Sequence, residues 1–461
     1  MKILQIIPGS GGSFYCGNCL RDSKYVEALK KLNHEVVKIP MYLPLFDDVD
    51  DQTKEVPVFY GAISIYLKQM SPFFRKAPKW FDRFLNSGPM LKFAAKMAGS
   101  TRATGLEDMT ISMLLGEEGK QHEELDRMVS WIGDNCNPDI IHLSNALLNG
   151  IAPKLKQVLN VPIVCSLQDE DVWIDPMEEK FQMRSWGLME ENSEYIDAYI
   201  SVSDYYSKLV REKMNIPKEK LFTLHLGVDP EEYESPSPHA STLRLRSGTA
   251  PLSDRNFEPP NPRDPESRVP SPKSRNIGFI SRMCHGNGVD IMINAYVLLK
   301  NMDGFDDVKL IMTGGSTGDD KEILKAIRKT INTSGLQDQV IFEEDFEKEG
   351  RTRFFNSVSF ISVPVRNGEA FGLYLLESMA SGVPVIQPAL GAFPEIIELS
   401  KGGKTYEPNT PEKIAETWAD LLKHPEEIKK MGEAGRSGVA KHFNIYDQGK
   451  QLIDIYNKLI N

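Results

Sequence analysis

The chain has 461 residues, of which 41% are hydrophobic and 26% charged, and its formal net charge is −11 at pH 7. This length suits two domains rather than one core, and the negative charge argues against a general nucleic-acid binder, because such binding depends on phosphate contacts from basic side chains. Five cysteines are too few for a disulfide framework, and without an uninterrupted apolar run of about 18 residues we expect a cytoplasmic protein.

The chain opens on the pattern of a Rossmann-like sheet. An apolar strand is predicted over residues 2–7, followed by the turn Pro-Gly-Ser-Gly-Gly, where the backbone can approach a ligand closely. A helix over 19–32 and a strand over 36–39 complete a βαβ unit. Because the glycines do not follow the spacing G-x-G-x-x-G, the turn is not a dinucleotide fingerprint.

Two cysteines lie where this first helix begins. Cys16 and Cys19 stand near a helix N-terminus, which stabilises a thiolate. A metal or redox role would need further ligands, and the sequence has no second C-x-x-C and no paired histidines. We therefore expect both cysteines to be structural or to line the ligand site, and we predict no metal site. Arg21 and Asp22 could face the same site.

Residues 68–102 differ in character from the rest of this acidic chain. They hold eight basic residues against one acid, with aromatic residues interleaved. A basic and aromatic helix can lie on an anionic membrane surface, which would make the protein peripheral at the inner membrane face. The alternatives are ordinary helices with solvated charges, or a role in binding an acceptor.

The alternation of strands and helices continues and is then interrupted by a linker. Further strands are predicted at residues 139–143, 161–167, 198–202 and 221–224, so the parallel sheet extends. Residues 235–275 instead hold nine prolines and few apolar residues. That composition cannot bury enough surface to offset chain entropy, so we predict a disordered or extended insertion.

A second series of strands and helices begins at residue 277. A strand over 277–280 leads to Arg282 and then to a helix that ends at Lys300, and a strand over 308–312 leads to Gly314 and Gly315. This glycine pair lets a ligand lie against the backbone. A short strand follows at 340–342, and residues 445–460 form an amphipathic helix near the end of the chain.

The most informative stretch runs from residue 364 to residue 395. A buried strand is stopped by Pro364, a loop follows, and apolar residues at helical spacing begin at Phe371. The first turn of that helix would present free amides at Phe371, Gly372 and Leu373, together with the positive end of the helix dipole. The pattern therefore predicts a seat for a phosphate group.

Two carboxylates flank this seat. Glu369 lies in the loop before the helix, and Glu377 lies in the second turn, so they should reach different atoms. Because a phosphate would repel both, hydroxyl groups are their plausible partners: one sugar at Glu369 and another, such as a ribose, at Glu377. The alternative is that Glu369 only complements the helix dipole and Glu377 is a solvated surface residue.

The whole stretch resembles the donor site of a known family. Glu369 and Glu377, with Phe371-Gly372 between them and Gly382-Val383-Pro384-Val385 after them, are similar to the E-x7-E signature of retaining GT-B glycosyltransferases, family 4 (glycosyl transferases group 1). The resemblance implies an α/β fold, GT-B, in which two Rossmann-like domains face each other across a cleft. Its parts would be an acceptor domain at 1–234, completed by a crossover helix at 445–461, a linker at 235–275, and a nucleotide-sugar-binding domain at 276–444.

The resemblance also implies roles for individual residues. Glu369 would hold the donor sugar, Glu377 the ribose and Arg282 the diphosphate, with Glu369 and Arg282 as the catalytic pair. The implied donor-binding residues are Glu377, Phe371, Gly372, Leu373, Gly314, Gly315, Gly11, Gly12 and Asn287.

The sequence departs from the family at two places. The family has a lysine five residues after the arginine, and this chain has Asn287, so we expect weaker donor affinity or compensation by Arg366 or His285. After the strand at 161–167 the family has a histidine, and this chain has Gln168, followed by Asp169. Glutamine cannot shuttle a proton, so Gln168 and Asp169 are acceptor-side candidates; the alternative is a solvated or capping acidic cluster.

The function implied is transfer of a sugar, most simply a hexose, from a nucleotide-diphosphate sugar to a hydroxyl of a glycan or lipid-linked acceptor. It would proceed with retention, without a metal and without a cofactor. A GT-B epimerase would need acid and base residues around the sugar, and a phosphorylase a cofactor lysine, and we identify neither. The remaining alternative is a non-catalytic sugar-nucleotide- or lipid-binding protein, which Asn287 and Gln168 favour.

Overall fold

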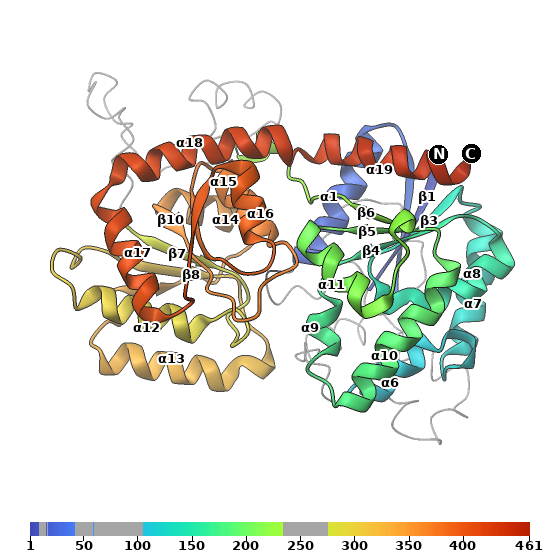
Figure 1. Ribbon diagram of the computed structural model, residues 1–461, viewed down its shortest axis with the longest axis horizontal. Helices are drawn as coiled ribbons and strands as arrows, with labels where there is room; N and C mark the ends of the chain where they lie inside the picture. Colours follow the sequence, from blue (N-terminus) through green and yellow to red (C-terminus); the bar gives the residue numbers. More distant parts are fainter. Residues whose placement is uncertain (9–14, 16, 42–58, 60–104, 234–274) are drawn as a thin grey trace, which may run out of the picture.

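The computed structural model describes residues 1–8, 15, 17–41, 59, 105–233 and 275–461, which build two parallel β-sheets flanked by helices (Figure 1). We call the part built on the first sheet the first lobe and the part built on the second sheet the second lobe. Each sheet has six strands in the described part of the chain. The predicted α/β architecture with two Rossmann-like units is confirmed, whereas the exact domain boundaries stay a prediction.

The first lobe is a parallel sheet with the order β2-β1-β3-β4-β5-β6. Its strands are β1 (Lys2–Ile7), β2 (Glu35–Pro40), β3 (Ile140–Leu143), β4 (Ile163–Leu167), β5 (Ala198–Ser201) and β6 (Leu221–Thr223). Its helices are α1 (Gly17–Lys31), α6 (Glu107–Leu114), α7 (His122–Asn135), α8 (Ala152–Leu159), α9 (Glu170–Ile174), α10 (Glu179–Asn192) and α11 (Asp204–Met214). The central strands β1, β3 and β4 are buried along almost their whole length because helices cover both faces of such a sheet.

The second lobe is a parallel sheet with the order β12-β11-β10-β7-β8-β9. Its strands are β7 (Ile277–Ile280), β8 (Leu310–Thr313), β9 (Val340–Phe342), β10 (Phe360–Ile361), β11 (Val385–Pro388) and β12 (Gly403–Tyr406). The helices that follow β7 in the chain are α12 (Val289–Lys300), α13 (Lys321–Thr333), α14 (Lys348–Ser357), α15 (Leu373–Ala380), α16 (Phe393–Ser400), α17 (Pro411–Lys423), α18 (Pro425–His442) and α19 (Ile445–Ile460).

In each sheet the strand order reverses beside the first strand. β1 has β2 on one side and β3 on the other, and β7 has β8 on one side and β10 on the other. Ligands of open α/β sheets bind beyond the carboxyl ends of the strands at such a reversal. The loops that follow β1, β3, β7 and β10 are therefore where a site is expected.

Helix α15 is the most buried helix of the second lobe, because all eight of its residues are inaccessible to solvent. Six of these residues are hydrophobic, which favours burial of the helix, and the two polar residues are Glu377 and Ser378. Helix α18 covers its C-terminal end closely: a Cβ added at Gly432 would lie 2.3 Å from the carbonyl oxygen of Gly382. This burial fixes the N-terminal tip of α15 relative to the sheet.

Helices α18 and α19 run end to end from the second lobe to the first, and α19 lies along α1 (Figure 1). Gly449 of α19 faces Ala28 and Leu32, and the hydroxyl of Tyr456 lies 2.5 Å from Nδ1 of His142 on β3. Burial lowers the pKa of His142 to about 3, so this imidazole is neutral. The last helix of the chain thus belongs to the packing of the first lobe.

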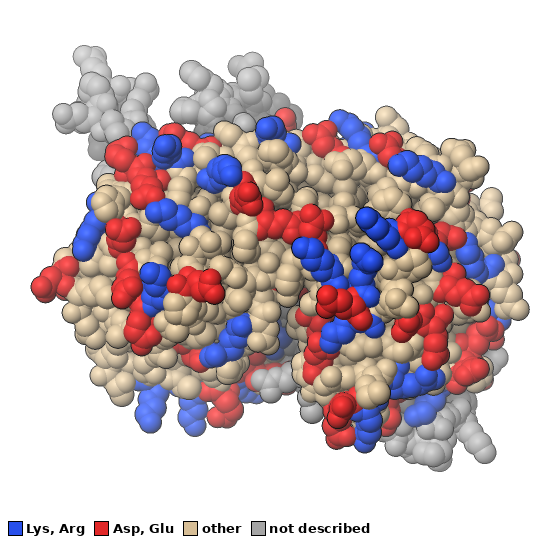
Figure 2. Space-filling view, in the orientation of Figure 1, with Lys and Arg blue, Asp and Glu red and all other residues tan. Residues whose placement is uncertain are grey.

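On the face drawn in Figure 2, the described acidic and basic side chains are interspersed, and neither sign dominates a large area. Such a face produces no strong single-sign field. Among the described helices, none combines the length and the apolar character that crossing a bilayer requires.

Candidate active site

The turn after β7 and the loop after β10 lie against each other at the strand-order reversal of the second lobe. The amide of Arg366 donates to the carbonyl oxygen of Gly286 (3.0 Å). Gly288, with φ of +69°, lies so close to Pro364 that an added Cβ would be 1.9 Å from its carbonyl oxygen. Only glycine permits such an approach. The two segments that the sequence singles out for donor binding are therefore neighbours.

The tip of α15 lies in this loop. The predicted start of the helix at Phe371 is wrong by two residues: α15 begins at Leu373, because Gly372 has φ of +88° and ψ of +72°, outside the helical region. Within the described part of the chain, no acceptor pairs with the amides of Phe371, Gly372 and Leu373. The tip thus offers free donors and the positive end of the helix dipole, which suit a phosphate group.

Glu369 precedes the tip and is held by the second lobe. Its side chain accepts a hydrogen bond from the hydroxyl of Tyr374 (2.8 Å), and its carbonyl oxygen accepts one from the amide of Ala392 (3.0 Å). Loss of water and the negative charge of Asp169 raise the pKa of Glu369 to about 8, although the bond from Tyr374 opposes this. Glu369 is therefore mainly protonated at neutral pH, and it can both donate and accept hydrogen bonds.

Asp169 approaches from the first lobe, two residues beyond β4. It is partly buried, and its backbone is left-handed, with φ of +64° and ψ of +21°. Its carboxylate accepts a long hydrogen bond from Nδ2 of Asn18 (3.4 Å). Burial and the charges of Asp171 and Glu170 raise the pKa of Asp169 to about 7. A strained backbone and a titration near neutrality are both typical of functional residues.

One expectation about this acidic cluster needs correction. The alternative of a solvated cluster is wrong for Glu170, which is 1% exposed and accepts hydrogen bonds from Tyr206 (2.7 Å) and from the amide of Ala146 (3.0 Å). The charge of Asp169, an acceptor-side candidate from the sequence, reaches Glu369. The lobes therefore bring two carboxyl groups together that lie 200 residues apart in the chain.

The two raised pKa values make stability depend on pH. Glu369 and Asp169 have pKa values of about 8 and about 7 in the fold, against ordinary values of 4.5 and 3.8. Their contribution to the free energy of unfolding is complete below the ordinary pKa values. It falls as the pH rises above those values and is lost once the pH has passed 7 for Asp169 and 8 for Glu369. The double variant E369Q/D169N should therefore gain stability relative to the wild type between pH 5 and pH 8. Urea midpoints measured across this range check it, and parallel curves would show that these carboxyls titrate normally.

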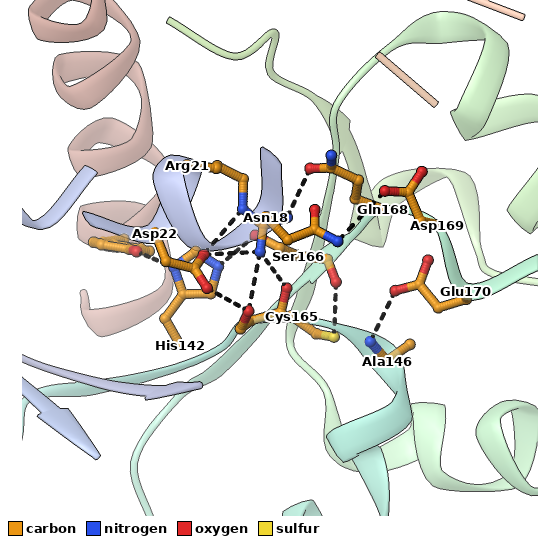
Figure 3. A network of polar contacts seen from close by, with 12 residues as sticks. Asn18, Arg21, Asp22, His142, Ala146, Cys165, Ser166, Gln168, Asp169 and Glu170 are labelled. Carbon is orange, nitrogen blue, oxygen red and sulfur yellow. Dashed lines mark hydrogen bonds and ion pairs between the residues drawn. The ribbon is translucent and has the colours of Figure 1, made fainter. Parts of the chain in front are cut away.

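Gln168 belongs to a buried polar network in the first lobe (Figure 3). Its Oε1 accepts a hydrogen bond from Arg21 (3.1 Å), whose guanidinium also pairs with Asp22 (2.8 Å) and donates to the carbonyl oxygen of Ser144 (2.7 Å). Arg21 and Asp22 are each 4% exposed, so they support the site from beneath rather than face it. The network fixes the position of Gln168, the residue before Asp169.

Glu377 is not a solvated surface residue, so that alternative is wrong. It is 1% exposed, and both of its oxygens are engaged. The hydroxyl of Tyr15 donates to Oε2 (2.6 Å), the hydroxyl of Tyr233 donates to Oε1 (2.7 Å), and Nε of Arg351 lies 3.1 Å from Oε1. Sequence reasoning missed all three partners; only Tyr15, which follows the first glycine loop, carried any local signal.

Arg282 lies in the turn after β7, and an acid of its own lobe holds it. Its Nε and one terminal nitrogen each lie 2.9 Å from an oxygen of Asp320, and the same nitrogen donates to Thr317 (2.9 Å). Despite its burial, Asp320 has a lowered pKa because Arg282 and Thr317 stabilise its charge. A diphosphate would have to share this guanidinium with Asp320.

Asn287 and the two residues expected to compensate for it also have partners. Nδ2 of Asn287 donates to Oγ of Ser281 (2.8 Å) and to the carbonyl oxygen of Arg282 (2.9 Å), so this side chain orders the turn. Arg366 forms an ion pair with Asp290 and donates to the carbonyl oxygen of His285 (3.0 Å). The guanidinium of Arg366 is thus already engaged in the second lobe.

The glycine turn after β8 lets the first lobe approach the second. Gly314 and Gly315 have φ of +118° and +70°, and a Cβ on Gly314 would lie 2.3 Å from the carbonyl oxygen of Ser281. The carbonyl oxygen of Gly314 accepts a hydrogen bond from the amide of Tyr15 (2.9 Å). This turn therefore joins the lobes beside the turn that carries Arg282.

A second contact ties the loop of Glu369 to the first lobe. Oγ of Ser203 donates to the carbonyl oxygen of Ala370 (2.7 Å). The carboxylate of Glu395 accepts hydrogen bonds from the amides of Asp204 (3.0 Å) and Tyr205 (3.2 Å) at the N-terminus of α11. A carboxylate is favourable at that end of a helix. The lobes are thus in direct contact around the proposed donor site.

Some predicted features lie outside the described residues, namely Gly11, Gly12, Cys16, the basic stretch at 68–102 and the insertion at 235–275 except Arg275. Cys19 is described, and it is partly buried in α1. In the part of the chain that the structure describes, no three His, Cys, Asp or Glu side chains are grouped so that they could hold a metal ion.

Two family models match the chain. The model for glycosyl transferases group 1 matches residues 261–438, and the model for Glycosyltransferase Family 4 matches residues 116–232. The first includes the turn after β7 and the tip of α15, and the second includes Asp169. The first matched region therefore contains Glu369 and Glu377, and the second contains Asp169.

Curated relatives share between a fifth and a quarter of their residues with the chain. An uncharacterised glycosyltransferase of Methanocaldococcus jannaschii is 22% identical over 64% of this chain and 68% of its own length. Spore coat protein SA of Bacillus subtilis is 22% identical over 86% and 95%. D-inositol 3-phosphate glycosyltransferase of Corynebacterium glutamicum is 24% identical over 51% and 54%, so the chain spans about half the length of that relative.

Solved structures share the fold over the whole chain. Sucrose-phosphate synthase from Thermosynechococcus elongatus superposes with a TM-score of 0.68 at 15% identity, covering 100% of this chain and 99% of its own. Anabaena HepE in complex with UDP and glucose superposes with a TM-score of 0.65 at 15% identity, covering 99% of each chain. At these identities the likeness is one of fold.

Proposed function

The chain belongs to the GT-B glycosyltransferases of group 1, and from this premise we propose that it transfers a glycosyl group from a nucleoside-diphosphate sugar to a hydroxyl acceptor with retention of configuration. The observation that carries the proposal is the tip of α15, set between Glu369 and Glu377 where the strand order reverses. Its amides from Phe371 to Leu373 have no acceptor among the described residues. A diphosphate would bind at the positive end of the dipole of α15, and hydroxyl-bearing groups on either side of it would bind Glu369 and Glu377.

On the donor side, each group of the substrate has a partner. The distal phosphate oxygens would accept hydrogen bonds from the amides of the tip, and Arg282 would add a charge that it shares with Asp320. The sugar hydroxyls would meet Glu369, which is protonated at neutral pH and can donate as well as accept. The ribose would meet Glu377. HepE binds UDP in its solved complexes, which favours UDP as a first probe.

On the acceptor side, we assign the acceptor hydroxyl to Asp169. Its pKa of about 7 leaves roughly half of the molecules ionised at neutral pH, so the carboxylate can accept a hydrogen bond from an attacking hydroxyl. Gln168 is held by Arg21 directly before it. Relatives act on inositol phosphate or on a phosphatidylinositol mannoside, as their names state, so a polyol or lipid-linked glycan is the acceptor class we propose.

We propose front-face departure for the chemical step. The bond between the anomeric carbon and the phosphate oxygen breaks, the bond from that carbon to the acceptor oxygen forms on the same face, and the acceptor proton passes to the departing diphosphate. The amides and dipole of α15 would stabilise the charge that develops on this leaving group. We expect a hexosyl donor and no requirement for a metal.

A donor panel tests this function. The purified chain is incubated with UDP-glucose, UDP-N-acetylglucosamine and GDP-mannose, with a mixture of polyol and glycan acceptors, with and without EDTA. We expect release of UDP or GDP from one donor, at a rate that EDTA does not change. We also expect NMR of the product to show the same axial anomeric linkage that the donor has. Inverted product would refute retention, and loss of activity with EDTA would refute metal independence.

The role of Asp169 predicts a split between two activities. D169N should lower the rate of transfer to an acceptor about 10²-fold, because the acceptor hydroxyl loses its charged partner. Slow hydrolysis of the donor, which depends on the second lobe, should stay within about twofold. D175N, at an exposed aspartate that pairs with Lys213, is the matched control. An equal fall of transfer and hydrolysis in D169N would contradict the acceptor role.

A non-catalytic sugar-nucleotide-binding protein is the second candidate, because one specific observation favours it. Arg282 is already paired with Asp320, and Asn287 stands in place of the second cation of the family and forms hydrogen bonds within the turn. Binding of a nucleotide sugar without turnover in the full panel would select this candidate. We further propose a cytoplasmic location with peripheral membrane contact through residues 68–102, which vesicle flotation can test.

A further inference from the structure

Glu377 presents its two oxygens to two hydroxyl groups of the first lobe. Tyr15 donates to one oxygen at 2.6 Å and Tyr233 to the other at 2.7 Å, while Arg351 supplies the neutralising charge at 3.1 Å. A carboxylate with one hydroxyl on each oxygen is also how an acid recognises a sugar diol. The partners that the structure gives Glu377 are thus chemically equivalent to the hydroxyls of a ribose.

Tyr15 also covers the neighbourhood of the α15 tip. Its ring meets the ring of Tyr374, in the first turn of α15, edge to face at 6.5 Å between centroids. The guanidinium of Arg351 lies 5.8 Å from the centre of the Tyr15 ring, and the amide of Tyr15 donates to Gly314 (2.9 Å). The side chain is 7% exposed. Tyr15 thus lies between the residues that would bind the sugar, the diphosphate and the ribose.

We propose that Tyr15 sets the donor affinity of this enzyme, because its hydroxyl occupies the position on Glu377 that a ribose hydroxyl would take when the nucleotide binds. This inference rests on the proposed function, in which Glu377 receives the ribose. Tyr15 acts as an internal competitor: each nucleotide that binds has to displace its hydroxyl from Oε2.

The exchange is possible because one hydroxyl replaces another. Leaving the carboxylate of Glu377, which is 1% exposed, without hydrogen-bond partners would cost free energy. Tyr15 therefore leaves Oε2 only when another hydrogen-bond donor takes its place. Burial and the nearby carboxylate raise the pKa of Tyr15 well above its ordinary value, so the phenol stays neutral and remains a donor. The apparent affinity for the nucleotide is therefore reduced by the fraction of molecules in which Tyr15 occupies the site.

Removing the hydroxyl tests the competition directly. UDP and GDP are titrated calorimetrically into the wild type, Y15F and the matched control Y25F, whose phenol on α1 donates to the carbonyl oxygen of His225 (3.2 Å), away from Glu377. We expect Y15F to bind the preferred nucleotide about tenfold more tightly, because one hydrogen bond to a charged group no longer competes. Y25F should bind as the wild type does.

A second measurement does not depend on a variant that folds. The amide of Tyr15 is bonded to Gly314, so displacement of Tyr15 by UDP in the wild type should speed deuterium uptake in the peptide that contains Tyr15. Slower uptake on binding would overturn the proposal, and so would unchanged or weaker nucleotide affinity in Y15F. If neither UDP nor GDP binds to the wild type or to Y15F, the proposed function itself fails, whereas binding without tightening removes only the role of Tyr15.

Discussion

Replacing Glu369 with alanine is expected to lower kcat/KM for glycosyl transfer by about 10² to 10³-fold, the usual cost of removing a preorganised polar group at a reacting centre. Glu369 stands directly before the tip of α15, and the carboxyl group of Asp169 acts on it from the other lobe. Donor sugar and acceptor would meet between these two acids. Steady-state rates with the preferred donor give the value.

The glutamine variant sharpens this prediction. Because the pKa of Glu369 is about 8, its carboxyl group is mainly neutral at pH 7, and the amide of glutamine has a similar shape and hydrogen-bonding capacity. E369Q should therefore lose only about tenfold at pH 7. E398A, at an exposed acid on α16, is the matched control and should behave as the wild type. Equal losses in E369A and E369Q would show that the ionised carboxylate is what the reaction needs.

Replacing Arg351 with alanine is expected to lower the free energy of unfolding by about 3 to 5 kcal/mol, because it leaves the carboxylate of Glu377 buried without its counter-ion. The side chains of the pair are only 9% and 2% exposed. Two tyrosine hydroxyls remain on Glu377, but hydroxyls do not cancel its charge. Urea unfolding measures the difference.

Two further variants make the Arg351 result interpretable. R353A is the matched control, since Arg353 lies on the same helix in an ion pair with Asp345 and its side chain is 65% exposed; its loss should stay below about 1 kcal/mol. The double variant R351A/E377Q removes both charges and should recover part of the stability. If R351A and R353A lower the free energy of unfolding by the same amount, the buried ion pair between Arg351 and Glu377 does not stabilise the fold as proposed.

Local patterns in the sequence were enough to predict most of the strands and the position of the loop that carries Glu369, but they did not indicate β12. The apolar runs that became β7 and β9 coincide with the predicted strands, because helices cover both faces of each sheet and leave continuous apolar segments. Glu369 and Glu377 were recognised for the same reason: their spacing along a loop and a helix is local. The start of α15 was misplaced because the left-handed backbone of Gly372 depends on the packing around it.

The partners of the acids could not be predicted, because they come from distant parts of the chain. Tyr15 lies 362 positions from Glu377, and nothing in the composition around Arg351 distinguishes it from the neighbouring Arg353. Likewise, the ion pair between Arg282 and Asp320 joins the turn after one strand to the turn after the next. Such pairs are set by the strand order and by the closing of the two lobes, which leave no short-range pattern.

A crystal structure of the chain with UDP would locate the nucleotide. We expect diphosphate oxygens within hydrogen-bonding distance of the amides at residues 371–373, a ribose hydroxyl on Oε2 of Glu377, and the hydroxyl of Tyr15 displaced from it. A nucleotide bound elsewhere, with the tip of α15 empty and Tyr15 still on Glu377, would contradict this expectation.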